Sequence, residues 1–307
     1  MSRVLVLGAT GRFGYAAAEA FRDAGWEVTS LVRSGRSDFA PRRTRIVEAV
    51  EHPDIIEAAR GADVVVHALN PLITEWERLS MSLTYVAIEA AEKAGATLLV
   101  PGNVYNYGAT MPETLDETTP QRPTMRKGLI RKLMEQRIRE ATERGMRALI
   151  LRAGDFYGGG RGSWFDLVVV KDMAANRITY PGPFDVVHEW AYLPDLAKAA
   201  VLLAEQREKF AAFEEFGFPG HAMTGNQLVV AIETATKRKF NVRRMSWWMI
   251  KTFGQMLAIG RELGEIEYLW RIPHRIDGSK LKAAIGEVPR TPMAAAVAAA
   301  LDDLKSR

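Results

Sequence analysis

Short apolar runs alternate with longer helix-favouring segments along the first half of the chain. Each run is too short for a helix and has the character of a strand that is buried on both faces, as in a parallel sheet. We therefore predict strands at residues 4–7, 27–32, 45–47, 63–69, 97–100 and 147–152.

The segments between these runs favour helices. They are rich in alanine, leucine and charged residues, and glycines follow several of them, as at helix ends. We predict helices at residues 15–24, 53–60, 79–93 and 126–143. Strands and helices in this alternation predict an α/β fold with a Rossmann-type, doubly wound parallel sheet.

The alternation weakens after Tyr157, where glycine, proline and aromatic residues become more frequent. Ligands of a doubly wound sheet sit beyond the carboxyl ends of its strands, so a later segment that covers this edge is expected to hold the substrate. We predict a dinucleotide-binding domain at residues 1–157 and 186–206. A smaller, C-terminal substrate-side cap is predicted at residues 158–185 and 207–307.

A glycine-rich turn follows the first predicted strand and opens the first predicted helix. Gly8 lets the chain turn sharply, Gly11 lets the backbone approach a pyrophosphate, and Gly14 lets the helix pack close to the strand. Free N–H groups at the helix N-terminus favour phosphates. This position predicts a dinucleotide site, with a turn that holds no ligand as the alternative. The residues expected to contact the cofactor are Gly8, Thr10, Gly11, Arg12, Phe13 and Gly14.

The end of the second predicted strand favours NADP(H) over NAD(H). NAD-binding proteins of this fold usually place an acidic residue there, which accepts a hydrogen bond from the ribose 2′-hydroxyl. This chain instead has Arg33, with Arg36 beyond it. The guanidinium of Arg33 is expected to pair with a 2′-phosphate, and a solvated surface arginine is the alternative. Arg12 is expected to stack on the adenine or to reach the same phosphate.

Several further motifs make the chain resemble the extended and atypical short-chain dehydrogenase/reductase superfamily, which includes NAD-dependent epimerases and dehydratases. The glycine spacing GATGRFG is one such motif. The others resemble family segments at residues 63–70, 104–108, 151–158, 188–197 and 276–292. The resemblance covers nearly the whole chain and implies the same fold. It also implies that the cofactor is lined by Ala68, Leu69, Asn70 and Phe156.

The expected catalytic residues of this superfamily are replaced. Its members use a Tyr-x-x-x-Lys pair on one helix face, in which the tyrosine is the acid/base and the lysine lowers its pKa and holds the nicotinamide ribose. The matching helix has Lys127 at the tyrosine position and Arg131 at the lysine position. The expected serine falls near Pro101, with Gly102 and Asn103 following.

Two interpretations of this helix stay open. In the first, Arg131 binds the ribose and Lys127 is the acid/base, as a lysine is in some reductases of the atypical branch. A lysine can do this when burial and a cationic neighbour lower its pKa. In the second, Lys127, Arg131 and Glu135 form an exposed ladder of i,i+4 pairs.

Residues after the fifth predicted strand offer rival groups. Tyr105 and Tyr107 are expected to approach the nicotinamide as acids, and packing is the alternative for Tyr105. Asn103 is expected to hydrogen-bond a substrate carbonyl or to cap the turn.

Composition narrows the remaining classes. The 307 residues are 48% hydrophobic and 25% charged, with a net charge of +4, as in an ordinary globular protein. The absence of cysteine excludes disulfides, thiolate catalysis and cysteine-ligated zinc. The five histidines show no metal-ligand spacing, so we predict no metal. The small basic excess without a helix-turn-helix signature predicts no nucleic-acid partner.

The strand-like N-terminus leaves no room for a signal peptide, and no apolar run approaches the roughly 20 residues of a membrane span. We therefore expect a cytoplasmic protein without a membrane partner. The strongly apolar segment 247–259 fits a cap helix that lines the substrate pocket or forms a homodimer contact.

Two functions follow from the sequence. The first is an NADP(H)-binding oxidoreductase or sugar-nucleotide-epimerase-like enzyme that acts by hydride transfer on a small carbonyl or sugar-derived substrate. The second is a catalytically silent NADP(H)-binding sensor or assembly module, which the replaced catalytic residues favour. Fold alone does not decide between them.

Overall fold

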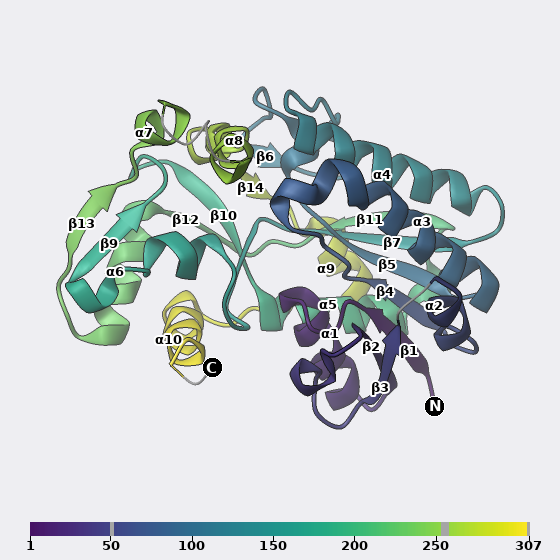
Figure 1. Cartoon of the computed structure of the whole chain (residues 1–307). Helices are drawn as coiled ribbons and strands as arrows, with labels where there is room; N and C mark the ends of the chain where they lie inside the picture. Colours follow the sequence, from purple (N-terminus) through teal and green to yellow (C-terminus); the bar gives the residue numbers. More distant parts are fainter. Residues whose placement is uncertain (50–51, 253–257, 306–307) are drawn as a thin grey trace.

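A computed structural model describes residues 1–49, 52–252 and 258–305, which form two lobes (Figure 1). The larger lobe contains a seven-stranded parallel sheet in the order β11-β7-β5-β4-β1-β2-β3. The strand order reverses between β1 and β4, which defines a doubly wound sheet of the Rossmann type. The predicted fold class is confirmed.

Six strands of this sheet coincide with the predicted apolar runs. In the central strand β4 every residue is buried, because helices cover both of its faces. The strands are β1 (Arg3–Leu7), β2 (Glu27–Arg33), β3 (Arg45–Ala49), β4 (Val64–His67), β5 (Thr97–Gly102), β7 (Arg147–Arg152) and β11 (Phe213–Gly217).

Strand β11 differs from the domain division expected from the sequence. It lies within residues 207–307, which were assigned to the cap, but it pairs with β7 and forms an edge of the large sheet. Two glutamates interrupt its sequence FEEFG, so it contains no continuous apolar run. Only its last two residues are buried. An edge strand with this pattern carries little hydrophobic signal.

Helices cover both faces of the sheet (Figure 1). One face carries α1 (Arg12–Asp23), α5 (Leu193–Glu205) and α9 (Ser279–Ile285). The other face carries α2 (His52–Ala58), α3 (Trp76–Ala94) and α4 (Arg126–Thr142).

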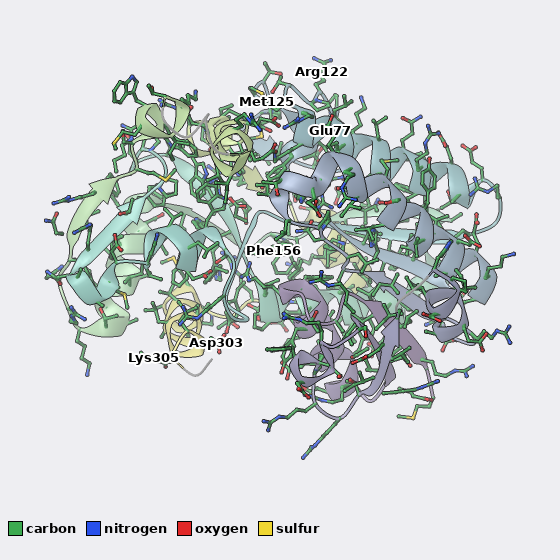
Figure 2. All side chains as sticks on the ribbon, viewed as in Figure 1. Glu77, Arg122, Met125, Phe156, Asp303 and Lys305 are labelled. Carbon is green, nitrogen blue, oxygen red and sulfur yellow. The ribbon has the colours of Figure 1, made fainter. Side chains whose placement is uncertain are left out.

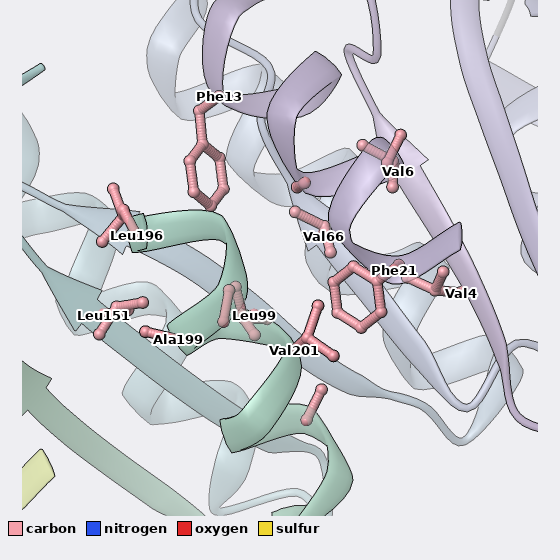
Figure 3. Close-up of a cluster of buried hydrophobic side chains, with 14 of the residues drawn as sticks. Val4, Val6, Phe13, Phe21, Val66, Leu99, Leu151, Leu196, Ala199 and Val201 are labelled. Carbon is pink, nitrogen blue, oxygen red and sulfur yellow. The ribbon is translucent and has the colours of Figure 1, made fainter. Parts of the chain in front are cut away.

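The first of these interfaces fixes the start of α1 (Figure 3). Phe13 and Phe21 of α1 are buried in one cluster with Val66 of β4 and Leu196 of α5. Full burial of such a side chain contributes about 1.5–3 kcal/mol. The N-terminus of α1, and the glycine-rich loop before it, is therefore held rigidly against the sheet.

The smaller lobe is built on a three-stranded sheet in the order β12-β10-β8 and on the pair β13-β9. Its core is aromatic and includes Tyr157, Tyr180, Trp190 and Trp270. The strands are β8 (Asp155–Tyr157), β9 (Arg177–Tyr180), β10 (Val187–Tyr192), β12 (His221–Thr224) and β13 (Asn241–Arg244). The helices are α6 (Gly225–Thr236), α7 (Trp247–Thr252), α8 (Ala258–Gly264) and α10 (Met293–Asp303). A short pair, β6 (Thr114–Leu115) with β14 (Arg275–Ile276), completes the strands.

Two segments of the cap differ from expectation. Strands β8 and β10 were assigned to the dinucleotide-binding domain, and they lie instead in the small sheet. The predicted helix at 247–259 is represented by α7 and by the start of α8, while residues 253–257 lie outside the described residues. No helix in the described ranges is both long and apolar enough to cross a membrane.

Candidate functional site

The glycine-rich loop joins β1 to α1 with very little free space. Gly8 has a φ of +81°, and a Cβ atom there would lie 2.9 Å from the carbonyl oxygen of Ala68. A Cβ atom at Gly14 would lie 2.3 Å from the carbonyl oxygen of Gly8. Gly11 is the N-cap of α1 and provides no side-chain cap, so the first amides of the helix are available to an anion.

Some residues next to this loop lie in the hydrophobic core, and others lie at the carboxyl edge of the sheet. The ring of Phe13 is buried and lies 6.2 Å from that of Phe156, measured between centroids. Figure 2 shows Phe156 between the two lobes. Ala68 and Leu69 follow β4 and are partly buried, as Thr10 is in the loop. The side chain of Phe13 therefore packs in the core, which leaves its backbone for a cofactor.

Arg12 extends from the loop to the cap. Its Nη2 donates to the carbonyl oxygen of Gly158 at 2.9 Å, and its buried Nε has no partner among the described residues. Burial lowers the pKa of Arg12 to about 10, while the charges of Asp166 and Asp155 act in the opposite direction. Arg12 therefore binds Gly158, the first residue after β8. The sequence had predicted instead that it stacks on the adenine or reaches the 2′-phosphate.

Two arginines and two carboxylates lie around the end of β2 and the turn after it, where Asp38 is exposed. Arg33 is exposed, and the guanidinium carbon of Arg36 lies 4.3 Å from the ring centroid of Phe39. Glu48 of β3 accepts hydrogen bonds from the hydroxyl of Ser37 at 2.6 Å and from the N–H of Gly35 at 3.3 Å. These bonds, the one from Ser37 first, hold the pKa of Glu48 below its ordinary value. Sequence reasoning missed Glu48, because its position depends on the pairing of β2 with β3.

Arg131 of α4 faces the residues that follow β4. Its guanidinium carbon lies 4.7 Å from the ring centroid of Trp76, and its Nη2 donates to the Oδ1 of Asn70 at 3.4 Å. Its buried Nε has no partner within the described part of the chain. Burial lowers the pKa of Arg131. The structure thus brings together Arg131 and Asn70, two predicted site residues from different elements.

Tyr105 lies beside Arg131. Burial raises the pKa of Tyr105 well above its ordinary value, the charge of Asp155 adds to this effect, and Arg131 opposes it. Its ring packs on Trp76 with centroids 6.1 Å apart. The Oδ1 of Asn103 accepts the N–H of Tyr105 at 3.1 Å, which is the turn-capping contact foreseen as one role of Asn103.

Lys127 is buried in an ionic cluster between α4 and the cap. Its side chain is 1% exposed and forms ion pairs with Glu262 and with Glu265, the latter at 3.6 Å. Burial raises the pKa of Glu262, but hydrogen bonding to Lys127 holds it below its ordinary value. The direct partners of Lys127 are therefore carboxylates, which Arg126 also binds, whereas the acid/base role was argued from a cationic neighbour alone.

The exposed-ladder interpretation of α4 is wrong. Lys127 and Glu135 are buried, and both pair with other elements. Glu135 binds Arg152 of β7 at 2.7 Å, and Arg152 also binds Glu215 of β11 at 2.5 Å. Arg152 is 1% exposed, and its Nη1 donates to the carbonyl oxygen of Asn103 at 2.5 Å. This network, which sequence reasoning missed, fixes α4 and the turn after β5 on the sheet.

The sheet, the loop and the residues at its carboxyl edge define a dinucleotide-binding protein of the Rossmann type. Residues 4–216 match the NAD dependent epimerase/dehydratase family, and the chain belongs to this family. It is thus an enzyme of the epimerase and oxidoreductase kind that uses a nicotinamide dinucleotide.

Solved structures share the fold over the whole chain. UDP-glucose 4-epimerase of Thermotoga maritima, with UDP-glucose, is 15% identical at a TM-score of 0.80 and covers 99% of both chains. MoeE5 in complex with UDP-glucose and NAD is 16% identical at a TM-score of 0.77, over 99% of this chain and 98% of that one. The 3-diazoavenalumate denitrifying reductase of Streptomyces sp is 29% identical over 221 residues, which are 66% of this chain and 72% of that protein.

Proposed function

We propose that this protein is an NADP(H)-dependent oxidoreductase that transfers hydride between its cofactor and a small carbonyl or sugar-derived substrate. The observation that carries this proposal is the meeting of three groups at one edge of the sheet. They are the tight glycine loop, Asn70 after β4 and Arg131 of α4. A dinucleotide along this edge would place its pyrophosphate on the N-terminus of α1 and its nicotinamide towards β5.

The preference for NADP(H) is supported by the turn after β2. Arg33 and Arg36 are the basic side chains at and just beyond the strand end, and the exposed Asp38 follows them. Glu48, a carboxylate on the neighbouring strand, is occupied by donors of the turn. It therefore holds the turn in shape and leaves Arg33 free for a 2′-phosphate.

The residues of the site have separable roles in this proposal. The bound cofactor supplies or accepts the hydride. Arg131, stacked on Trp76 and bonded to Asn70, would hold the nicotinamide ribose. Lys127 stays a candidate acid/base from the sequence, although its ion pairs give it a second role in joining α4 to the cap.

The direction of reaction is suggested by the relative from Streptomyces sp, which is a reductase. Reduction of a carbonyl compound by NADPH is therefore the reaction to test first. The alternative function, a catalytically silent NADP(H)-binding module, predicts tight binding of NADPH without turnover.

The test is an assay of NADPH consumption with 9,10-phenanthrenequinone, 4-nitrobenzaldehyde and, for epimerase activity, UDP-glucose. The proposal predicts consumption of NADPH that depends on one of the two carbonyl compounds and is much slower with NADH. Conversion of UDP-glucose to UDP-galactose without net NADPH consumption would identify an epimerase instead. Binding of NADPH with no reaction would favour the silent module.

A further inference from the structure

A buried aspartate–histidine pair lies where the cap joins the Rossmann lobe. Asp155 opens β8, three residues after the carboxyl end of β7, and His188 is on β10. The Nε2 of His188 lies 2.8 Å from the Oδ2 of Asp155. The side chain of His188 is 3% exposed, whereas that of Asp155 is 18% exposed. The carboxyl group of Asp155 is thus the more accessible part of the pair.

The imidazole of His188 is held by the aromatic rings around it. Its ring is stacked on Trp270 at 4.0 Å between centroids and 2° between planes, and the ring of His274 lies 4.7 Å away. Its Nδ1 is buried and has no hydrogen-bond partner in the described ranges. The one polar partner that the structure gives this ring is therefore Asp155, and packing determines its orientation.

Asp155 lies just beyond the carboxyl end of β7, the edge of the sheet at which ligands of this fold bind, and its carboxyl group is partly exposed there. Its charge acts on Arg12, at the start of α1, and on Tyr105, after β5. These two residues stand at the two ends of the proposed cofactor edge, the N-terminus of α1 and the turn after β5. Phe156, the next residue, packs on Phe13 at the start of α1, so β8 lies against the glycine-rich loop.

We propose that Asp155 is the proton donor and acceptor of the reaction and that His188 is its positioning residue. This inference rests on the proposed function, because the step needs NADPH. In reduction, the carbonyl carbon gains the hydride of NADPH with its electron pair, and the π electrons move to the oxygen. Asp155 delivers the proton that it shares with His188 to this oxygen, so the products are an alcohol and NADP⁺. Water then returns a proton to the pair.

Most of the titratable groups around the Asp155–His188 pair are uncharged near neutral pH. Burial lowers the pKa of His274 to about 3, with a further contribution from the charge of His188. Burial raises the pKa of Tyr105 and of Tyr180, to both of which the charge of Asp155 adds. These three neighbours are therefore uncharged near neutral pH, and Arg12 supplies a positive charge on the cofactor side.

Asp155 is better placed for this role than Lys127. The ammonium of Lys127 is enclosed by two carboxylates and its side chain is 1% exposed. The carboxyl group of Asp155 has one fixed partner and open surface. A positioned acid/base whose other side is held by a second group is the arrangement that proton transfer requires.

The first experiment compares Asp155→Asn, Lys127→Met and the control Glu189→Gln with the wild type. Glu189 is also a buried carboxyl on β10, next to His188, but its partner is the N–H of Ile276. NADPH oxidation with 9,10-phenanthrenequinone and 4-nitrobenzaldehyde gives kcat and KM. We expect Asp155→Asn to lower kcat about 100-fold or more, the usual contribution of a general acid. KM, the Kd for NADPH and the unfolding temperature are expected to stay close to wild type.

His188→Gln separates positioning from mere packing. Its amide keeps a hydrogen bond to Asp155 but cannot share a proton. We expect the variant to bind NADPH normally and to move the pH of half-maximal kcat by about one unit or more, while Glu189→Gln leaves that pH unchanged. Full kcat in Asp155→Asn, or loss of kcat in Lys127→Met alone, would overturn the proposal.

A second readout does not depend on turnover. A protonated imidazole quenches the fluorescence of an indole stacked on it, so Trp270 reports on His188. We expect a pH-dependent emission in the wild type, its loss in His188→Gln and in Trp270→Phe, and an altered pH profile in Asp155→Asn. An unchanged pH profile in Asp155→Asn would show that the two groups share no proton and would overturn the inference, even if no probe is reduced. Failure to bind NADPH would instead refute the proposed function.

Discussion

Glu189 makes the stability of the fold depend on pH. Its side chain is 1% exposed on β10, and its Oε2 accepts the N–H of Ile276 at 3.1 Å. Burial raises the pKa of Glu189 to about 8 from 4.5, although the N–H groups of Ile276 and Gly220 act in the opposite direction. The folded protein therefore holds a proton on this carboxyl at pH values where the unfolded chain has released it.

The sign and size of the effect follow from this difference. Because the pKa is higher in the folded state, the stabilisation is complete below about pH 4.5 and is lost as the pH rises through about 8. At about 1.4 kcal/mol per unit of pKa, the loss reaches about 5 kcal/mol above pH 8. Glu189→Gln has no proton to lose, so its stability is not subject to this change.

Urea unfolding at about pH 5, 7 and 9 measures the effect on the wild type, on Glu189→Gln and on a control, Glu27→Gln, which changes an exposed glutamate. We expect the free energy of unfolding of Glu189→Gln to gain several kcal/mol on the wild type between the lowest and highest pH. The control is expected to follow the wild type. Parallel profiles of the wild type and Glu189→Gln would refute the reasoning.

Three further substitutions test the loop and the two ionic clusters. Gly14→Ala drives a Cβ against the Gly8 carbonyl, so we expect a loss of about 1–3 kcal/mol in unfolding and weaker NADPH binding. Gly264→Ala, where the added Cβ would meet no atom within 4 Å, is expected to bind NADPH normally. Lys127→Met removes the buried ammonium from the cluster and leaves Glu262 with Arg126 alone. We expect a urea midpoint clearly below the wild type, with an unchanged midpoint as the contrary result. Arg152→Met leaves two buried carboxylates unpaired, and we expect a loss of about 3–5 kcal/mol that shrinks at low pH, when they protonate; a pH-independent loss would contradict this.

The large sheet was predictable because most of its strands are buried on both faces and read as apolar runs. Strand β4 is the clearest case, with all four residues buried. Strand β11 was missed because Glu214 and Glu215 stand in its middle at a partly exposed edge. Strand β8 was assigned to the wrong lobe because its partner β10 is distant in sequence. A strand of three residues is too short for its pattern to indicate which strand it pairs with.

The site was predictable where a motif fixes position along one element. The order of strand, glycine loop and helix located the loop. Arg131 and Asn70 were each expected at the cofactor, and the structure places them in contact. Contacts between distant segments were not predictable in this way. Lys127 finds its carboxylate at Glu262, and Asp155 finds His188, only because the cap folds back on the sheet. The helix periodicity could not show that Lys127 is buried.

The measurement that tests the account most directly is a fluorescence titration of the protein with NADPH and with NADH, repeated on Arg33→Ala. Arg60→Ala, which changes another exposed arginine, is the matched control. We predict that the wild type and the control prefer NADPH. In Arg33→Ala the affinity for NADPH is expected to fall about tenfold or more, because a charge-assisted hydrogen bond contributes about 1.5–3 kcal/mol, while the affinity for NADH stays unchanged. Equal affinities in the wild type, or a preference for NADH, would contradict the assignment of Arg33 and of NADP(H).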